Sequence, residues 1–162
     1  MLGRMADGAF PRVDLSPHWQ SVQESLLHLI DVIPNDQLNF TPREGLWNSR
    51  GILIHVADAR DRWLAERVQD GEPYPNIWLT ARTKDDLGGE MARTFERLQR
   101  FLRDQAQLDA TYRFVWDDGS VEHLEERTGH WIAFHLLEHD IHHRAELMQR
   151  LALLGIDHGL DF

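Results

Sequence analysis

The chain has 162 residues, of which 42% are hydrophobic and 27% are charged, as in soluble globular proteins, so we expect a single domain over residues 1–162. Its formal net charge of −10 disfavours nucleic acid as a partner, because polyanions are bound through cationic side chains. The sequence has no cysteine, which excludes disulfides and protein thiolate ligands, and the lack of a long apolar run or a secretory signal predicts a cytoplasmic protein with no membrane partner.

The first predicted helix follows a loose lead-in over residues 1–15. Ser16 and Pro17 are typical of an N-cap followed by proline at the first helical position. Apolar residues then recur at spacings of three and four until Pro34, which predicts one buried stripe along a helix. Residues 37–47 contain proline and glycine and predict a loop.

Two more helices are predicted in the middle of the chain. Ser49 is the expected cap of the second helix, which should run to about Gln69. Residues 71–82 carry two prolines and predict a connection. Thr83, with an aspartate three residues later, resembles a capping box that opens a third helix ending near Gln107.

The last part of the chain predicts a long helix preceded by a short extended segment. Residues 112–121 are rich in aromatic and β-branched types around Asp118-Gly119, which favours a small hairpin or an extended loop. Thr128 is the expected cap of a fourth helix that ends near Leu154. Helices with one apolar stripe each bury those stripes best against one another. The sequence therefore predicts an all-α, up-down four-helix bundle, with a short hairpin before the last helix.

The fourth helix carries a run of histidines whose helical phase separates them into two sets. At about 100° per residue, His143 falls within the apolar stripe and His139 at its edge, whereas His135 and His142 lie progressively further from the core. Two histidines one turn apart on one face can grip a single ion. Pairs with this spacing, such as His139 and His143, also arise by chance on polar helices. Because His135 and His142 lie further from the core, they are either supporting groups or surface residues.

His55 offers a third imidazole at the margin of the second helix's apolar stripe. Taken alone, an inward histidine is more often a hydrogen-bonded core residue than a ligand. Three neutral imidazoles from two helices would leave positions open for water or substrate, as in catalytic metal sites. Trp47 and Trp131 are candidate walls of a pocket. The remaining histidines are interpreted as surface or loop residues: His18, His28, His123, His130 and His158.

The order of several short motifs resembles the DinB/YfiT-like family. The chain reads Trp47-Asn-Ser, then Ile54-His-Val-Ala-Asp58, then Leu137-Glu-His-Asp-Ile-His-His-Arg-Ala-Glu-Leu147 and Leu153-Leu-Gly155. The resemblance implies a four-helix bundle, often homodimeric, with a metal held by one histidine of the second helix and an HxxxH pair of the last. Those positions are His55, His139 and His143. Many relatives have glycine and glutamine where this chain has Ala145 and Glu146, which puts local packing rather than the ligands in doubt.

The resemblance also implies a reaction class. Relatives with assigned activities include S-transferases and isomerases that use mycothiol, bacillithiol or glutathione. It thus implies a metal-dependent transferase acting on a small-molecule substrate, with one divalent ion, zinc or nickel, and a low-molecular-weight thiol as nucleophile. A metal-dependent hydrolase is the alternative, with Asp58 as its general base. A non-catalytic stress-response binding protein with a structural metal is a third.

Overall fold

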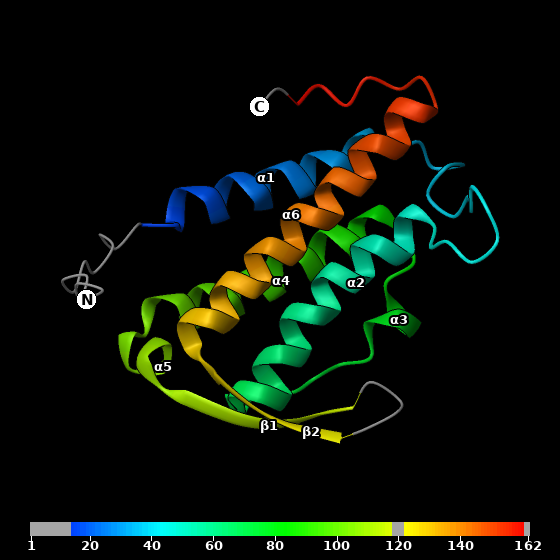
Figure 1. Cartoon of the computed structure of the whole chain (residues 1–162). Coiled ribbons are helices and arrows are strands. Elements are labelled where there is room, and N and C mark those ends of the chain that lie inside the picture. The colour runs from blue at the N-terminus through cyan, green and yellow to red at the C-terminus, as the bar shows by residue number, and fades with distance from the viewer. Residues whose placement is uncertain (1–13, 118–121, 161–162) are drawn as a thin grey trace, which may run out of the picture.

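The computed structural model describes residues 14–117 and 122–160, and this part of the chain is mainly helical, as predicted. Its four long helices are α1 (Ser16–Val32), α2 (Ser49–Arg62), α4 (Lys84–Arg103) and α6 (Gly129–Leu153). The helix α2 packs against α4 and α6, and α1 packs against the same two helices (Figure 1). The four helices surround one hydrophobic core, to which each contributes fully buried side chains.

Shorter elements join the long helices. Along the chain they are the π-helix η1 (Trp63–Val68), the helices α3 (Ile77–Thr80) and α5 (Gln105–Asp109), and the strands β1 (Thr111–Asp117) and β2 (Glu122–Thr128). Within the described residues, no helix is both long and apolar enough to span a bilayer.

Two of the predicted caps are confirmed. The Thr83 hydroxyl accepts a hydrogen bond from the backbone N–H of Asp86, and the Asp86 carboxylate accepts one from the N–H of Thr83, which completes a capping box at the start of α4. At the start of α6, the Thr128 hydroxyl accepts from the N–H of Trp131 over 3.2 Å. Both caps satisfy backbone donors that the first helical turn leaves without a partner.

The other two predicted caps are wrong by one residue. Asn48, not Ser49, caps α2, because its Oδ1 accepts from the N–H of Gly51 over 2.7 Å. In α1 the residue Ser16 is already helical, and its N–H donates to Asp14 Oδ1 over 2.9 Å. When two adjacent residues near the start of a helix could both act as the N-cap, the sequence pattern does not show which of them does.

One predicted helix end is confirmed and one is wrong. The second helix, expected to continue to about Gln69, stays helical to Val68. It changes to a π-helix after Arg62, and the N–H of Gln69 donates to the carbonyl of Leu64 five residues back. The third was expected to end near Gln107 and ends at Arg103, because Asp104 caps the separate helix α5 with its carboxylate. The connection over residues 71–82 also contains the single-turn helix α3.

The extended segment before α6 is an antiparallel hairpin, so the fold is not purely α-helical. Its register runs from Thr111 opposite Thr128 to Asp117 opposite Glu122. The sequence predicted a hairpin or an extended loop over residues 112–121, and the second strand, over residues 122–128, lies beyond that range. The predicted turn at Asp118-Gly119 lies outside the described residues. In Figure 1 the hairpin lies beside the start of α6 and the end of α2.

Candidate metal centre

Three half-buried histidines from two helices meet on one side of the fold. His55 comes from the second turn of α2, and His139 and His143 lie one turn apart on α6. Each offers a ring nitrogen, and these atoms all lie within 4.8 Å of one another. The Nε2 atoms of His55 and His139 are 2.9 Å apart. The structure thus brings together the three residues that the sequence predicted as ligands.

Carboxylates stand behind two of these rings. His139 Nδ1 lies 3.3 Å from Asp140 Oδ1, and His143 Nδ1 lies 3.1 Å from Glu146 Oε2. A carboxylate that accepts from Nδ1–H fixes the imidazole in the tautomer whose Nε2 carries the lone pair. This leaves His139 Nε2 free to act as a ligand on the side that faces His55.

The carboxylate of Asp140 is itself held in a fully buried network. Arg60 donates from Nε to Asp140 Oδ2 over 2.8 Å, and its Nη2 lies 2.7 Å from the same oxygen. The Nη1 of Arg60 donates to Gln23 Oε1 over 2.9 Å. Both charged side chains are completely buried. If one of them moved away, the other would remain in the interior as an unpaired charge, which is energetically costly. The network therefore fixes the position of Asp140.

Burial favours the neutral form of two imidazoles in the cluster, those of His55 and His143. Burial, with a smaller effect from the neighbouring rings of His139 and His143, lowers the pKa of His55 to about 4. Burial and the proximity of His139 also lower the pKa of His143. A neutral imidazole is the form that binds a metal ion. Three imidazole nitrogens, with carboxylates behind two of the rings, fit a divalent cation that keeps an open coordination position.

A second group of potential ligands shares one residue with the first. His142, His143 and Glu146 also offer three donor atoms within 4.8 Å of one another. His142 is exposed, however, and its ring meets His143 edge to face at 5.0 Å between centroids. The sequence pointed to Glu146 only as a departure from the family pattern. Glu146 lies three residues after His143 on the same helix, and this spacing in the sequence is the signal for their contact.

The carboxylate of Asp58, the predicted general base, contacts other side chains than those of the three histidines. Its Oδ1 accepts a hydrogen bond from the hydroxyl of Tyr74 over 2.9 Å, and Arg62 lies 3.5 Å from its Oδ2. The carboxylate lines a small cavity together with Tyr74 and Trp78. Among the described residues, the polar contacts of Asp58 are therefore with Tyr74, which precedes α3, and with Arg62 on its own helix, and not with the imidazole cluster.

One of the two predicted tryptophans contacts the cluster directly, and the other contacts its neighbour His135. Trp47 meets the ring of His55 edge to face at 4.5 Å, and it also contacts Trp78 at 5.9 Å. Trp131 stacks on His135, one turn before His139, with centroids 5.0 Å apart and planes 8° from parallel. Of the two predicted pocket walls, Trp47 thus contacts His55 of the cluster, and Trp131 contacts His135, which lies one turn away from it.

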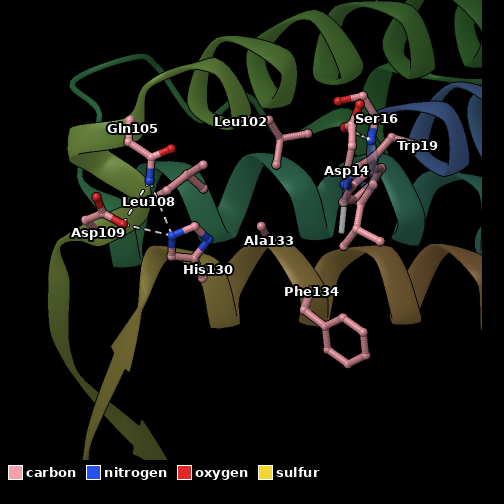
Figure 2. A pocket seen from close by; sticks show the side chains of 11 residues that line it. Asp14, Ser16, Trp19, Leu102, Gln105, Leu108, Asp109, His130, Ala133 and Phe134 are labelled. Atoms are coloured by element: carbon pink, nitrogen blue, oxygen red, sulfur yellow. Dashed lines mark hydrogen bonds and ion pairs between the residues drawn. The ribbon is translucent and has the colours of Figure 1, made fainter. Parts of the chain in front are cut away.

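A larger cavity, of about 620 Å³, lies on a different face of α6. His130, Ala133 and Phe134 line its α6 side, and Figure 2 shows His130 beside Asp109 and Gln105 at one end. His130 Nε2 lies 2.9 Å from Asp109 Oδ1. None of the three predicted ligands lines this cavity.

Comparison with known proteins identifies the family of this chain. The model of the DinB superfamily matches residues 18–147. Among solved structures, the fold is similar to that of a DinB-like protein, YjoA, from Bacillus subtilis, with a TM-score of 0.64 and 20% sequence identity over 90% of this chain and 94% of that one. No curated protein matches. Since the family model covers most of the chain, including every residue of the histidine cluster, the protein belongs to the DinB superfamily.

Proposed function

We propose that this protein is a metal-dependent transferase in which His55, His139 and His143 hold one divalent cation, zinc or nickel. The observation that carries the proposal is the convergence of three half-buried imidazole nitrogens, two of them backed by carboxylates. In this proposal the four long helices form the up-down bundle that the family resemblance implies. The homodimer implied by the same resemblance belongs to the proposal too, and light scattering tests it.

The chemistry needs a nucleophile that the protein does not supply, because the chain has no cysteine. Held by His55, His139 and His143, a divalent cation would supply the positive charge that lowers the pKa of a small-molecule thiol, so that the thiol is present as its thiolate near neutral pH. The sulfur forms a bond to an electrophilic carbon of the substrate, and the leaving group departs with its electron pair. The side chains of this protein hold the imidazoles in place: Asp140 and Glu146 orient those of His139 and His143, and Trp47 packs against that of His55.

Metal analysis combined with a conjugation assay tests the proposal. Purified wild-type protein should contain about one divalent ion per chain, and His139→Ala should lose it, since two imidazoles hold a cation far more weakly than three. The matched control is His142→Ala, which removes an exposed imidazole on the same helix and should leave the metal content unchanged. Loss of metal in His142→Ala but not in His55→Ala would assign the ion to the group around Glu146 instead.

The same proteins are then incubated with monobromobimane or chlorodinitrobenzene and each of mycothiol, bacillithiol and glutathione. Wild type and His142→Ala should accelerate conjugation with one of these thiols, and chelation or His139→Ala should abolish the acceleration. Turnover of esters or amides without thiol conjugation would contradict the transferase proposal in favour of a hydrolase. Metal binding without either activity would contradict it in favour of a binding protein.

A further inference from the structure

A small aromatic cavity lies between the hairpin and the first turns of α6, beside the histidine cluster. Its volume is about 240 Å³, which suits a ligand of one or two fused rings, because pockets for drug-sized ligands begin at about 300 Å³. The π-helix, both strands and α6 each contribute side chains. They are Trp63, Phe114, Glu125, Arg127, Trp131 and His135.

The rings of the cavity hold one another in place. Trp63 stands perpendicular to Phe114 at 5.4 Å between centroids and lies 6.0 Å from Trp131. His135 packs against Trp63 at 4.9 Å and stacks on Trp131. Trp63 and Phe114 are buried, whereas Trp131 is 39% exposed. A ligand that stacks here therefore meets rigid rings and costs little side-chain entropy.

The charged side chains at the cavity are already paired with each other. Arg127 lies over the ring of Trp131 at 4.9 Å and forms an ion pair with Glu125. Arg67 lies over Phe114 at 5.3 Å. Because the carboxylate and the guanidinium in the cavity wall neutralise each other, a charged ligand gains no net attraction there. His135 and Arg127 lie against the ring of Trp131, and Arg67 lies against that of Phe114. A ligand therefore meets the uncovered parts of these rings, and a flat ring fits against them in offset or edge-to-face geometry.

His135 links this cavity to the candidate metal centre. It lines the cavity and lies four residues before His139 on α6, so the two side chains are neighbours on one helix face. We propose that the cavity binds a neutral, planar aromatic small molecule. Resting on the proposed function, we further infer that it holds the aromatic group of the electrophile one helical turn from the nucleophile.

Calorimetric titration with 1,3-dinitrobenzene tests the proposal. This probe is flat, neutral and electron-poor, and it lacks a leaving group, so no conjugation interferes. We expect saturable binding, weakened about tenfold in Trp131→Ala and changed less than about threefold in Trp131→Phe, which keeps an aromatic ring. Nitrocyclohexane, a saturated probe of similar size, should bind about tenfold more weakly than 1,3-dinitrobenzene. Circular dichroism confirms that each variant keeps its helices.

Two controls locate the bound probe and separate this proposal from the proposed function. Phe134→Ala removes an exposed ring from the larger cavity on the other face of α6 (Figure 2) and should leave binding unchanged. His139→Ala should also leave binding of the probe unchanged, because His139 does not line the cavity. The cavity can therefore be tested even in a protein that holds no metal and has no activity. Equal binding by wild type and Trp131→Ala, or loss of binding in Phe134→Ala, would overturn the assignment.

Discussion

At the scale of single residues, the candidate metal centre depends on side chains that contact the histidines but are not themselves candidate metal ligands. Asp140 is fully buried and points one carboxylate oxygen at His139 and the other at Arg60. An aspartate at this depth is stable as an anion only because a guanidinium pairs with it. The buried pair of Arg60 and Asp140 thus helps to set which ring nitrogen of the half-buried His139 carries the proton.

The variant Asp140→Asn tests this connection. An amide cannot fix the His139 tautomer as a carboxylate does, so we expect metal affinity to fall about 10- to 100-fold. Removal of the buried charge also leaves Arg60 without its partner and should lower the free energy of unfolding by about 3–5 kcal/mol. Competition with a fluorescent chelator measures the first effect at a temperature where the variant is folded, and urea unfolding measures the second.

Asp109→Asn is the matched control, because Asp109 also lies against a histidine, the exposed His130. It should change neither the metal affinity nor the stability beyond about 0.5 kcal/mol. An Asp140→Asn protein with wild-type metal affinity would show that the Arg60 network serves packing alone.

At the scale of elements, the start of α6 depends on a close approach between two backbones. A Cβ at Gly129 would lie 2.2 Å from the carbonyl oxygen of Gln107 and 2.7 Å from the Cα of Leu108. The N–H of Gly129 also donates to the carbonyl of Ala110 over 3.0 Å. Because backbone atoms cannot move aside as a flexible side chain can, only glycine fits where α6 passes α5. This contact sets the point from which the histidine helix begins.

Two glycine-to-alanine variants should therefore have opposite effects. Gly129→Ala should lower the free energy of unfolding by about 1–3 kcal/mol, because the added methyl group is overpacked. Gly89→Ala in α4 has no atom within 4 Å of the new Cβ and should raise it by about 0.5–1 kcal/mol, since alanine favours the helix. Urea unfolding of both variants measures the difference. A stabilising effect of Gly129→Ala would contradict the close approach.

At the scale of the whole molecule, the core and the candidate metal centre are separate parts of the fold. The core draws fully buried apolar side chains from all four long helices. The histidine cluster joins only α2 and α6 and is half-buried. A cation there adds to a structure that the hydrophobic core already maintains.

Chelation tests this separation. Removal of the metal should leave the helical circular dichroism and the cooperative unfolding transition intact. Resupplied metal at about 100 times its Kd should add about 2.7 kcal/mol, which corresponds to a rise of roughly 5–10 °C in Tm for a chain of this size. His143→Ala should show no such rise. Collapse of the helical signal on chelation would instead indicate a metal that the fold requires.

The sequence by itself determined the features that arise within one helix. The caps at Thr83 and Thr128 act over three residues, and the face shared by His139 and His143 follows from helical periodicity alone. For the same reason, the sequence predicted the mainly helical class. The histidines also matched a family pattern, and that resemblance was needed to select His55.

Tertiary structure decided whatever depends on contacts between distant parts of the chain. His55 and His139 are 84 residues apart, and Arg60 and Asp140 are 80 apart. Helical phase places each side chain on a face but does not say which faces meet. The second strand and the aromatic cavity likewise form only when the hairpin packs beside η1 and α6. The candidate ligands His139 and His143 could therefore be predicted from local periodicity, whereas packing between helices brought His55 and the carboxylate of Asp140 to them.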